Sequence, residues 1–161
     1  MLHGLAHTAI CVPDVDAAVA WYAGALGLRV LSPPYRMEGP EIERDMGELV
    51  PAPVVVRAAI LGFDASDHVL ELVEYPSAPS APRATGQVTD TGITHVGLVC
   101  DDVSATRSQL VAAGAEPLTT TVAAVAGLRT AWVRDPFGIV LILLEKGHRD
   151  RPYWHQHAPL A

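Results

Sequence analysis

Apolar and polar positions follow the same order twice along the chain. In each copy a short run of alternating apolar residues ends at an Asp-Val pair, Asp14-Val15 or Asp102-Val103, and an Ala-rich segment with helical spacing follows. The aspartates stand where helix N-caps belong, because their carboxylates can accept hydrogen bonds from the first backbone N–H groups. The pattern predicts that each copy begins with a strand and a helix.

Spacing within the Ala-rich segments predicts one buried face on each helix. The first face consists of Val15, Ala18, Val19, Tyr22 and Leu26, and the second of Val103, Leu110 and Ala113. The remaining apolar runs indicate strands at 28–31, 54–62 and 68–75, then at 115–122, 128–134 and 139–146. Each copy is therefore predicted to contain a strand, a helix and three further strands.

The repeat also aligns residue by residue. The segment from His7 matches the segment from His95 at an offset of 88, whereas 71–74 matches 142–145 at an offset of 71, so the first copy carries about 17 extra residues. We place them in an inserted loop at 32–53, whose prolines, methionines and charges are typical of a surface loop or of a substrate-binding lid. The predicted organisation is a first module at 1–75, a linker at 76–92, a second module at 93–147 and a tail at 148–161.

Composition and charge narrow the possible functions. Hydrophobic residues make up 50% of the 161 residues and charged residues 18%, as in a globular protein. The net charge of −7, without a cluster of Lys or Arg, argues against nucleic acid as a partner. The apolar runs are too short to span a bilayer and the start MLHGLAH lacks signal-peptide features, so we expect a cytoplasmic protein without a membrane partner.

Three residues stand out as candidate metal ligands. His7 and His95 occupy equivalent positions of the repeat, and Glu71 is a charge within an otherwise apolar strand, where it shares its face with Val73 and Tyr75. A buried charge there is costly unless it is paired or bound to a metal. A lone strand histidine is most often structural, but two equivalent histidines and a carboxylate favour a divalent-metal site, with a vestigial origin as the alternative.

The chain resembles the vicinal oxygen chelate superfamily in several segments: His7 opening a strand, VLELVEY at 69–75, THVGLV at 94–99 and RDPFG at 134–138. That superfamily includes glyoxalase I, methylmalonyl-CoA epimerase, extradiol dioxygenases, and the fosfomycin and bleomycin resistance proteins. The resemblance covers about residues 4–147 and is nearest to the epimerase-like members. It implies an α+β fold in which two tandem βαβββ modules form a cupped mixed sheet around a central metal or ligand site, within a homodimer.

The resemblance also implies which positions hold the metal. One ligand is expected from the first and one from the last strand of each module, at His7, Glu71, His95 and Ile142. Ile142 departs from the pattern, because glyoxalase-like and epimerase-like members have a carboxylate there. Glu145 is not an obvious substitute, since it lies three residues further along, on the opposite strand face. We therefore expect three ligands, for an ion such as Fe, Ni, Co, Zn or Mn.

In this superfamily a bound ion chelates two neighbouring substrate oxygens and stabilises an enolate. The resemblance thus predicts an isomerase, epimerase or lyase acting on a small carbonyl or thioester compound. Two alternatives stay open, a non-haem Fe(II) extradiol-type dioxygenase and a metal-free, resistance-type protein that binds a small molecule. A base for proton abstraction would be Glu41, Glu43 or Glu48 on the insert, although solvated loop charges are the commoner interpretation.

Two further features have an open role. Arg57, at the start of a predicted strand, is either a contact to a substrate anion or an exposed surface residue. Tyr153 and Trp154 would be unusual in a solvated tail, so we expect them to dock on the body of the protein or on a second subunit. A tail histidine in place of the missing fourth ligand is a further option.

Overall fold

The computed structural model describes residues 3–64, 68–78, 81, 88–89 and 91–156. It divides into two compact units, Met1–Pro82 and Arg83–Ala161. The boundary falls inside the Pro- and Ser-rich segment 76–92. None of the helices described is long and apolar enough to cross a membrane.

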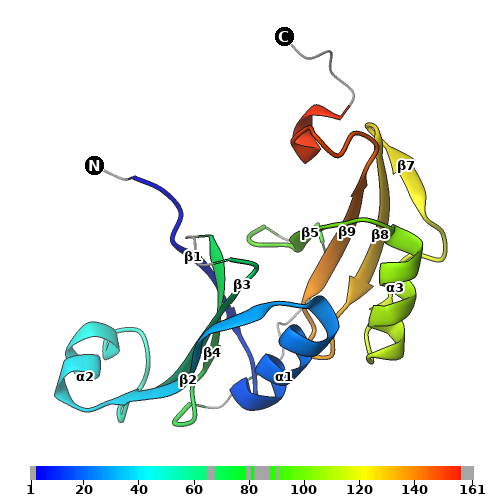
Figure 1. Ribbon diagram of the computed structural model, residues 1–161. Helices are drawn as coiled ribbons and strands as arrows, with labels where there is room; N and C mark the ends of the chain where they lie inside the picture. The colour runs from blue at the N-terminus through cyan, green and yellow to red at the C-terminus, as the bar shows by residue number, and fades with distance from the viewer. Residues whose placement is uncertain (1–2, 65–67, 79–80, 82–87, 90, 157–161) are drawn as a thin grey trace. The chain divides into compact units, whose positions relative to one another are not determined.

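The first unit contains a four-stranded mixed sheet and two helices (Figure 1). Its elements are β1 (His7–Cys11), α1 (Val15–Leu26), β2 (Arg29–Glu38), α2 (Pro40–Met46), β3 (Val55–Gly62) and β4 (Val69–Glu74). The strand order is β1-β4-β3-β2, with β1 parallel to β4 and the other pairs antiparallel. This order makes the first and last strands neighbours, and Ala9 lies opposite Glu71.

The second unit repeats this arrangement. Its elements are β5 (Val96–Cys100), α3 (Val103–Ala112), β6 (Glu116–Pro117), β7 (Ala123–Val125), β8 (Leu128–Arg134), β9 (Val140–Lys146) and a 3-10 turn, η1 (Tyr153–His155). The strand order is β5-β9-β8-β6, and β7 also pairs with β8. β5 is parallel to β9, with Gly97 opposite Ile142. The predicted α+β fold with βαβββ-like modules is therefore confirmed.

Two segments differ from their predicted structure. β2 continues to Glu38 and α2 follows it, so 32–53 is not simply a loop. Pro33 and Pro34 argue against a strand in the sequence, because proline has no backbone N–H to donate. β2 nevertheless accommodates them, because it is an edge strand with an irregular register, where a missing N–H is tolerated. In the second unit the run at 115–122 contains only the two-residue strand β6.

The helices α1 and α3 begin in the same way, as predicted. The Asp14 carboxylate accepts a hydrogen bond from the Ala17 N–H at 2.9 Å. The Asp102 carboxylate accepts from the Ser104 and Ala105 N–H groups at 2.8 and 2.9 Å. Each aspartate thus supplies partners for N–H groups that a helix start leaves unpaired.

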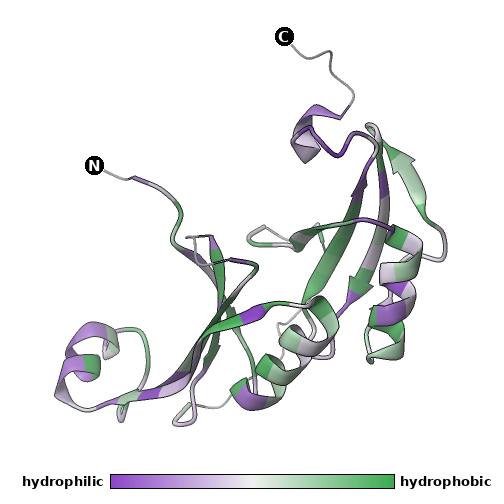
Figure 2. Ribbon diagram, viewed as in Figure 1, coloured by the Kyte–Doolittle hydropathy of each residue, from purple (hydrophilic) through white to green (hydrophobic). Residues whose placement is uncertain are grey.

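α1 and α3 each pack on one face of the sheet in their own unit. Figure 2 shows hydrophobic residues along β5 and β9, whereas α2 carries mainly hydrophilic ones. The buried helix residues are Val15, Ala18 and Tyr22 in α1 and Val103 and Leu110 in α3, and the strand residues Leu72, Leu141 and Leu143 are buried as well. Ala113 is exposed, contrary to expectation, because it is the C-cap of α3. Alternation along the strands leaves Glu71 and Ile142 on the face away from the helix.

Candidate functional site

Glu74 in β4 and Glu145 in β9 turn toward the helix of their own unit. The Glu74 carboxylate accepts a hydrogen bond from the N–H of the first residue of α1 at 3.0 Å, and Glu145 accepts from the first residue of α3 at 2.9 Å. The two glutamates are therefore equivalent positions of the repeat. Glu71 and Ile142, each three residues earlier, are equivalent too. Glu145 is engaged at a helix start, in agreement with its expected strand face.

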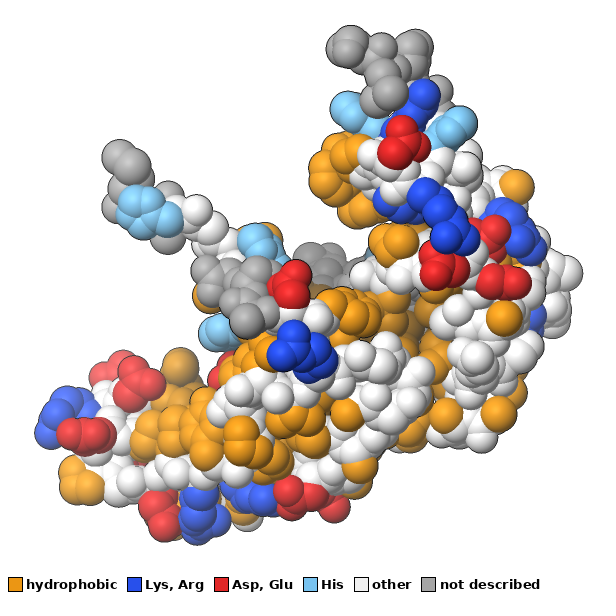
Figure 3. Space-filling view, in the orientation of Figure 1, with side chains coloured by type: hydrophobic (Ala, Val, Ile, Leu, Met, Phe, Trp, Pro, Cys, Tyr) orange, Lys and Arg blue, Asp and Glu red, His pale blue; other side chains and the backbone are white. Residues whose placement is uncertain are grey.

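Arg57 is engaged within the first unit. Its guanidinium donates to Asp16 at 2.8 Å and to Glu74 at 3.2 Å. The hydrogen bond with Asp16 raises the pKa of the Arg57 guanidinium. Arg129 donates to Glu145 at 2.9 Å in the same manner. Figure 3 shows basic side chains beside acidic ones on the visible face. Arg57 thus supports the helix side of the sheet, which replaces the interpretation of a substrate contact.

On the other face of the first sheet the structure brings His7 and Glu71 together. β1 and β4 are parallel neighbours, so His7 at the start of β1 reaches the Glu71 side chain on the adjacent strand. The His7 Nε2 and Glu71 Oε2 atoms are 3.4 Å apart. The Glu71 side chain is only 19% exposed, whereas that of His7 is 49% exposed. The carboxylate is therefore largely shielded from solvent, whereas the imidazole is about half exposed.

The spacing of this pair fits a divalent cation. Bonds from such an ion to imidazole nitrogen or carboxylate oxygen are about 2.1 Å long. With bonds of that length, two ligand atoms 3.4 Å apart subtend an angle of about 108° at the ion, close to the tetrahedral value. His7 and Glu71 can hold one ion without movement of either strand.

Tyr75 and Cys11 accompany Glu71 on this face. Burial, with smaller contributions from Cys11 and Glu71, raises the pKa of the Tyr75 phenol. Loss of hydration raises the pKa of the Cys11 thiol. Both groups keep their protons at neutral pH, so they can donate hydrogen bonds but are poor bases. Strand parity places Tyr75 on the same face as Glu71, with Val73 between them, but nothing in the sequence marks it for chemistry.

The insert packs against the same face of the first sheet. A buried cluster of Val54, Val56 and Val73 is covered by partly buried residues of the insert and its surroundings: Met37, Ile42, Met46, Val50 and Tyr75. Because Val73 and Tyr75 share the face of Glu71, this cluster occupies the end of the candidate site. The insert therefore has the location that a substrate-binding lid requires.

The three glutamates proposed as bases differ in their surroundings. The Glu43 carboxylate accepts a hydrogen bond from the Val54 N–H at 2.6 Å, which ties α2 to the chain entering β3. Glu41 and Glu48 are exposed. Glu43 thus has a structural task in the insert, and the other two face solvent.

In the second unit His95 stands just before β5. Its Nδ1 shares a hydrogen bond with the Thr94 hydroxyl at 2.7 Å, and its ring meets Trp132 edge to face with the centroids 4.9 Å apart. These contacts orient the ring and leave Nε2 as the nitrogen for a ligand, a common arrangement around metal-binding histidines. Among the residues that the structure describes in either unit, no three His, Cys, Asp or Glu side chains are grouped to hold a metal ion.

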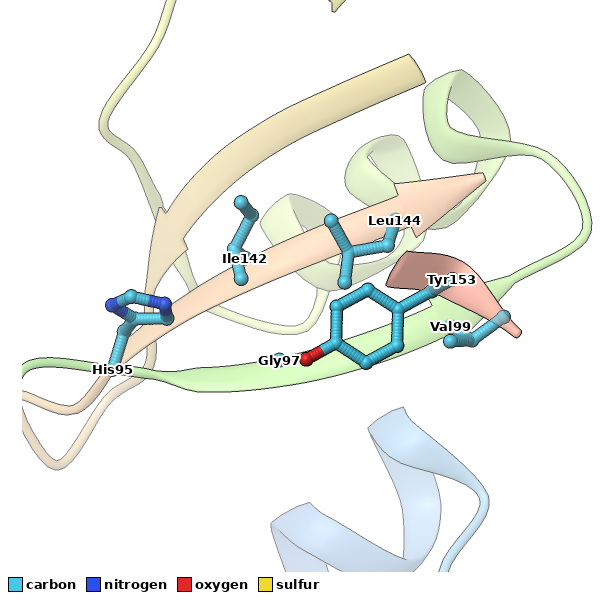
Figure 4. A pocket seen from close by; sticks show the side chains of 6 residues that line it. All are labelled: His95, Gly97, Val99, Ile142, Leu144 and Tyr153. Carbon is cyan, nitrogen blue, oxygen red and sulfur yellow. The ribbon is translucent and has the colours of Figure 1, made fainter. Parts of the chain in front are cut away.

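A cavity of about 410 Å³ lies on the face of β5 and β9 (Figure 4). It is lined by His95, Gly97, Val99, Ile142, Leu144 and Tyr153. Ile142 thus contributes an apolar wall where the first unit has Glu71. Tyr153 borders this cavity but is 47% exposed, and Trp154 is 63% exposed, so the docking expected for these two aromatic residues is seen only in part, for Tyr153. Residues 157–161, which include the tail histidine His157, lie outside the described part of the chain.

Known proteins share this sequence pattern and fold. The family model of the Glyoxalase/Bleomycin resistance protein/Dioxygenase superfamily matches residues 4–143. A glyoxalase family protein from Bacillus cereus is similar with a TM-score of 0.78 and 23% identity, over 90% of this chain and 95% of that one. The trypanothione-dependent glyoxalase I of Leishmania major gives a TM-score of 0.63 and 22% identity, over 90% and 88%. No curated protein matches the sequence.

Proposed function

Because the chain belongs to the Glyoxalase/Bleomycin resistance protein/Dioxygenase superfamily, we propose that it is a divalent-metal-dependent enzyme, an isomerase, epimerase or lyase acting on a small carbonyl or thioester compound. The observation that carries this proposal is the pair formed by His7 and Glu71, whose ligand atoms are 3.4 Å apart on adjacent parallel strands. The Glu71 side chain is only 19% exposed, and its spacing from the His7 imidazole is compatible with both groups binding one divalent ion.

The proposed ligands are His7, Glu71 and His95, for Fe, Ni, Co, Zn or Mn. With Ile142 at the fourth family position, three protein ligands leave more positions for water and substrate oxygens than four would. A bound ion supplies Lewis-acid stabilisation of negative charge on a substrate oxygen.

The remaining residues of the site orient and shield. The Thr94 hydroxyl fixes the ring of His95. Tyr75, protonated at neutral pH, offers a hydrogen-bond donor on the same face of the sheet as Glu71. The insert excludes water from the end of the face at Val73. A base for proton transfer is proposed among the exposed glutamates of the insert, Glu41 and Glu48, and not at Glu43, whose carboxylate holds the backbone.

Metal content tests this proposal directly. The chain, purified without chelator, is analysed by plasma mass spectrometry, and chelator-stripped protein is titrated calorimetrically with Mn, Co, Ni and Zn. We expect about one ion per chain in the parent, and affinity at least about tenfold lower in His7→Ala, Glu71→Gln and His95→Ala, because each change removes a ligand. His3→Ala removes an exposed histidine outside the tail and serves as the control.

Absence of metal from the parent, together with titrations that none of the three variants alters, rejects the proposal and favours the metal-free binding protein. Oxygen uptake with ferrous iron across a catechol panel would assign the protein to the dioxygenases instead. We further propose a homodimer, which light scattering on the purified chain measures.

A further inference from the structure

The C-terminal strap, defined as residues 147–156, is anchored by a buried glutamine. Gln156 is 3% exposed, and its side-chain oxygen accepts a hydrogen bond from the His148 N–H at 2.7 Å. Its side-chain nitrogen donates to the carbonyls of His148, Arg151 and Pro152 at 3.1, 3.2 and 3.0 Å. A single side chain thus closes the strap into a loop of fixed shape.

The strap is also joined to the sheet of the second unit. Gly127, just before β8, has a φ of +77°, and a Cβ there would lie 3.0 Å from Gln156 Cβ and 3.1 Å from its backbone carbonyl. Lys146, the last residue of β9, donates to the Arg151 carbonyl at 2.9 Å. Tyr153 therefore belongs to a segment that is hydrogen-bonded to the second unit, and not to a frayed chain end.

Tyr153 faces an apolar wall. Figure 4 shows its hydroxyl directed along β5 toward the end of the cavity where Gly97 and His95 lie. A Cβ at Gly97 would contact Ile142 and Leu144, each at 3.6 Å, so the glycine keeps the floor of the cavity flat. The volume of about 410 Å³ is near the lower end of the range for small-molecule sites.

The lining decides which ligand chemistry fits. None of the six lining residues is Lys, Arg, Asp or Glu, and the polar groups are the His95 ring and the Tyr153 hydroxyl. A charged group placed between Ile142 and the tyrosine ring would lose hydration without gaining a partner. An aromatic or branched aliphatic group would gain apolar contacts and ring packing.

We propose that Tyr153 closes a subsite for an uncharged aromatic or branched aliphatic group of a small molecule, held against Ile142 and Leu144. The inference rests on the proposed function in one respect: this group is the apolar part of the small carbonyl or thioester compound proposed as the substrate. Ile142 then contributes to ligand binding, because its side chain forms a wall of the subsite at the position where the family has a metal ligand. Tyr153 determines specificity for that group.

The test uses the full chain and 4-(trifluoromethyl)benzyl alcohol as the probe, with its dissociation constant measured by fluorine NMR titration. Tyr153→Ala is expected to raise the dissociation constant about tenfold, and Tyr153→Phe to leave it within about threefold, because the ring and not the hydroxyl makes the contact. Ile142→Glu is expected to weaken the probe as well. Phe63→Ala, which removes an aromatic residue that is 61% exposed in the first unit, is the matched control.

Equal probe affinity in Tyr153→Ala and Phe63→Ala overturns the proposal. So does a Tyr153→Ala variant that changes the oligomeric state in light scattering while its probe affinity stays at the parent value, since the face would then belong to a second copy. Metal content of the same samples separates the two proposals. A chain that binds the probe with the expected Tyr153 dependence but holds no metal contradicts the proposed function and supports the subsite.

Discussion

Replacing Glu74 by alanine removes the carboxylate that joins β4 to the start of α1. In the structure this carboxylate accepts from the Val15 N–H at 3.0 Å and from Arg57 at 3.2 Å. Val15 is fully buried and the Glu74 side chain is 18% exposed, so water can replace the lost partner only in part. The Val15 N–H is among the helix-start donors that have no partner within the helix.

The size of the effect follows from the charged acceptor. A hydrogen bond to a charged group contributes about 1.5–3 kcal/mol, and a buried donor left unpaired incurs its full desolvation cost. We expect Glu74→Ala to lower the free energy of unfolding by about 2–3 kcal/mol. Glu74→Gln should lower it by about 1 kcal/mol, because the amide oxygen still accepts from Val15 but carries no charge.

Urea unfolding at pH 7, followed by circular dichroism, measures these differences. Glu145→Ala should behave like Glu74→Ala, because Glu145 makes the same contact at the start of α3. Glu38→Ala removes a glutamate whose ion pair with Arg36 is exposed, and it should leave the unfolding curve unchanged. A loss below about 0.5 kcal/mol in Glu74→Ala, no larger than in this control, would refute the reasoning that strand glutamates anchor the helix starts.

Three further outcomes are expected. Gly24 is exposed within α1 and nothing lies within 4 Å of an added Cβ, so Gly24→Ala should raise the free energy of unfolding in urea by about 0.5–1 kcal/mol. Gly127→Ala should displace the C-terminal strap, because the new methyl meets Gln156 at 3.0 Å, and trypsin should then cut after Arg149 faster than in the parent. Hydrogen bonds from the Ala105 and Ser104 N–H groups lower the pKa of the Asp102 carboxyl, so its contribution to stability is present above its unfolded pKa and lost as the pH falls through the folded value. Asp102→Asn should accordingly flatten the acid limb of the stability–pH curve.

The features of the fold that could be predicted from the sequence, the helix starts and the faces of the strands, depend on local patterns. Asp14 and Asp102 are recognisable as caps because a carboxylate before an apolar helical face has a direct geometric task. The alternation in 69–75 separates Glu71 from Glu74, and the structure places them on opposite faces of β4. Such features depend on residues near in sequence and on the strand period, so a single chain is enough to predict them.

Contacts made at a distance account for what was missed. β2 extends through Pro33 and Pro34 because it lies at a sheet edge, a fact that only the strand order reveals. The structural task of Glu43 depends on the Val54 N–H, eleven residues away, and the charge pattern of the insert does not reveal that contact. The seat of Tyr153 depends on Gly127 and Gln156, which are far apart in sequence and carry no motif.

Substitutions on the two faces of β4 and β9 should affect this protein in separate ways. Toward the helices the two strands carry the same anchor, Glu74 or Glu145, whereas on the opposite face one has Glu71 and the other Ile142. Side chains on opposite faces share no partners, so their effects on stability should add independently. One half of a duplicated fold can therefore exchange an ionic group for an apolar one while its helix stays anchored.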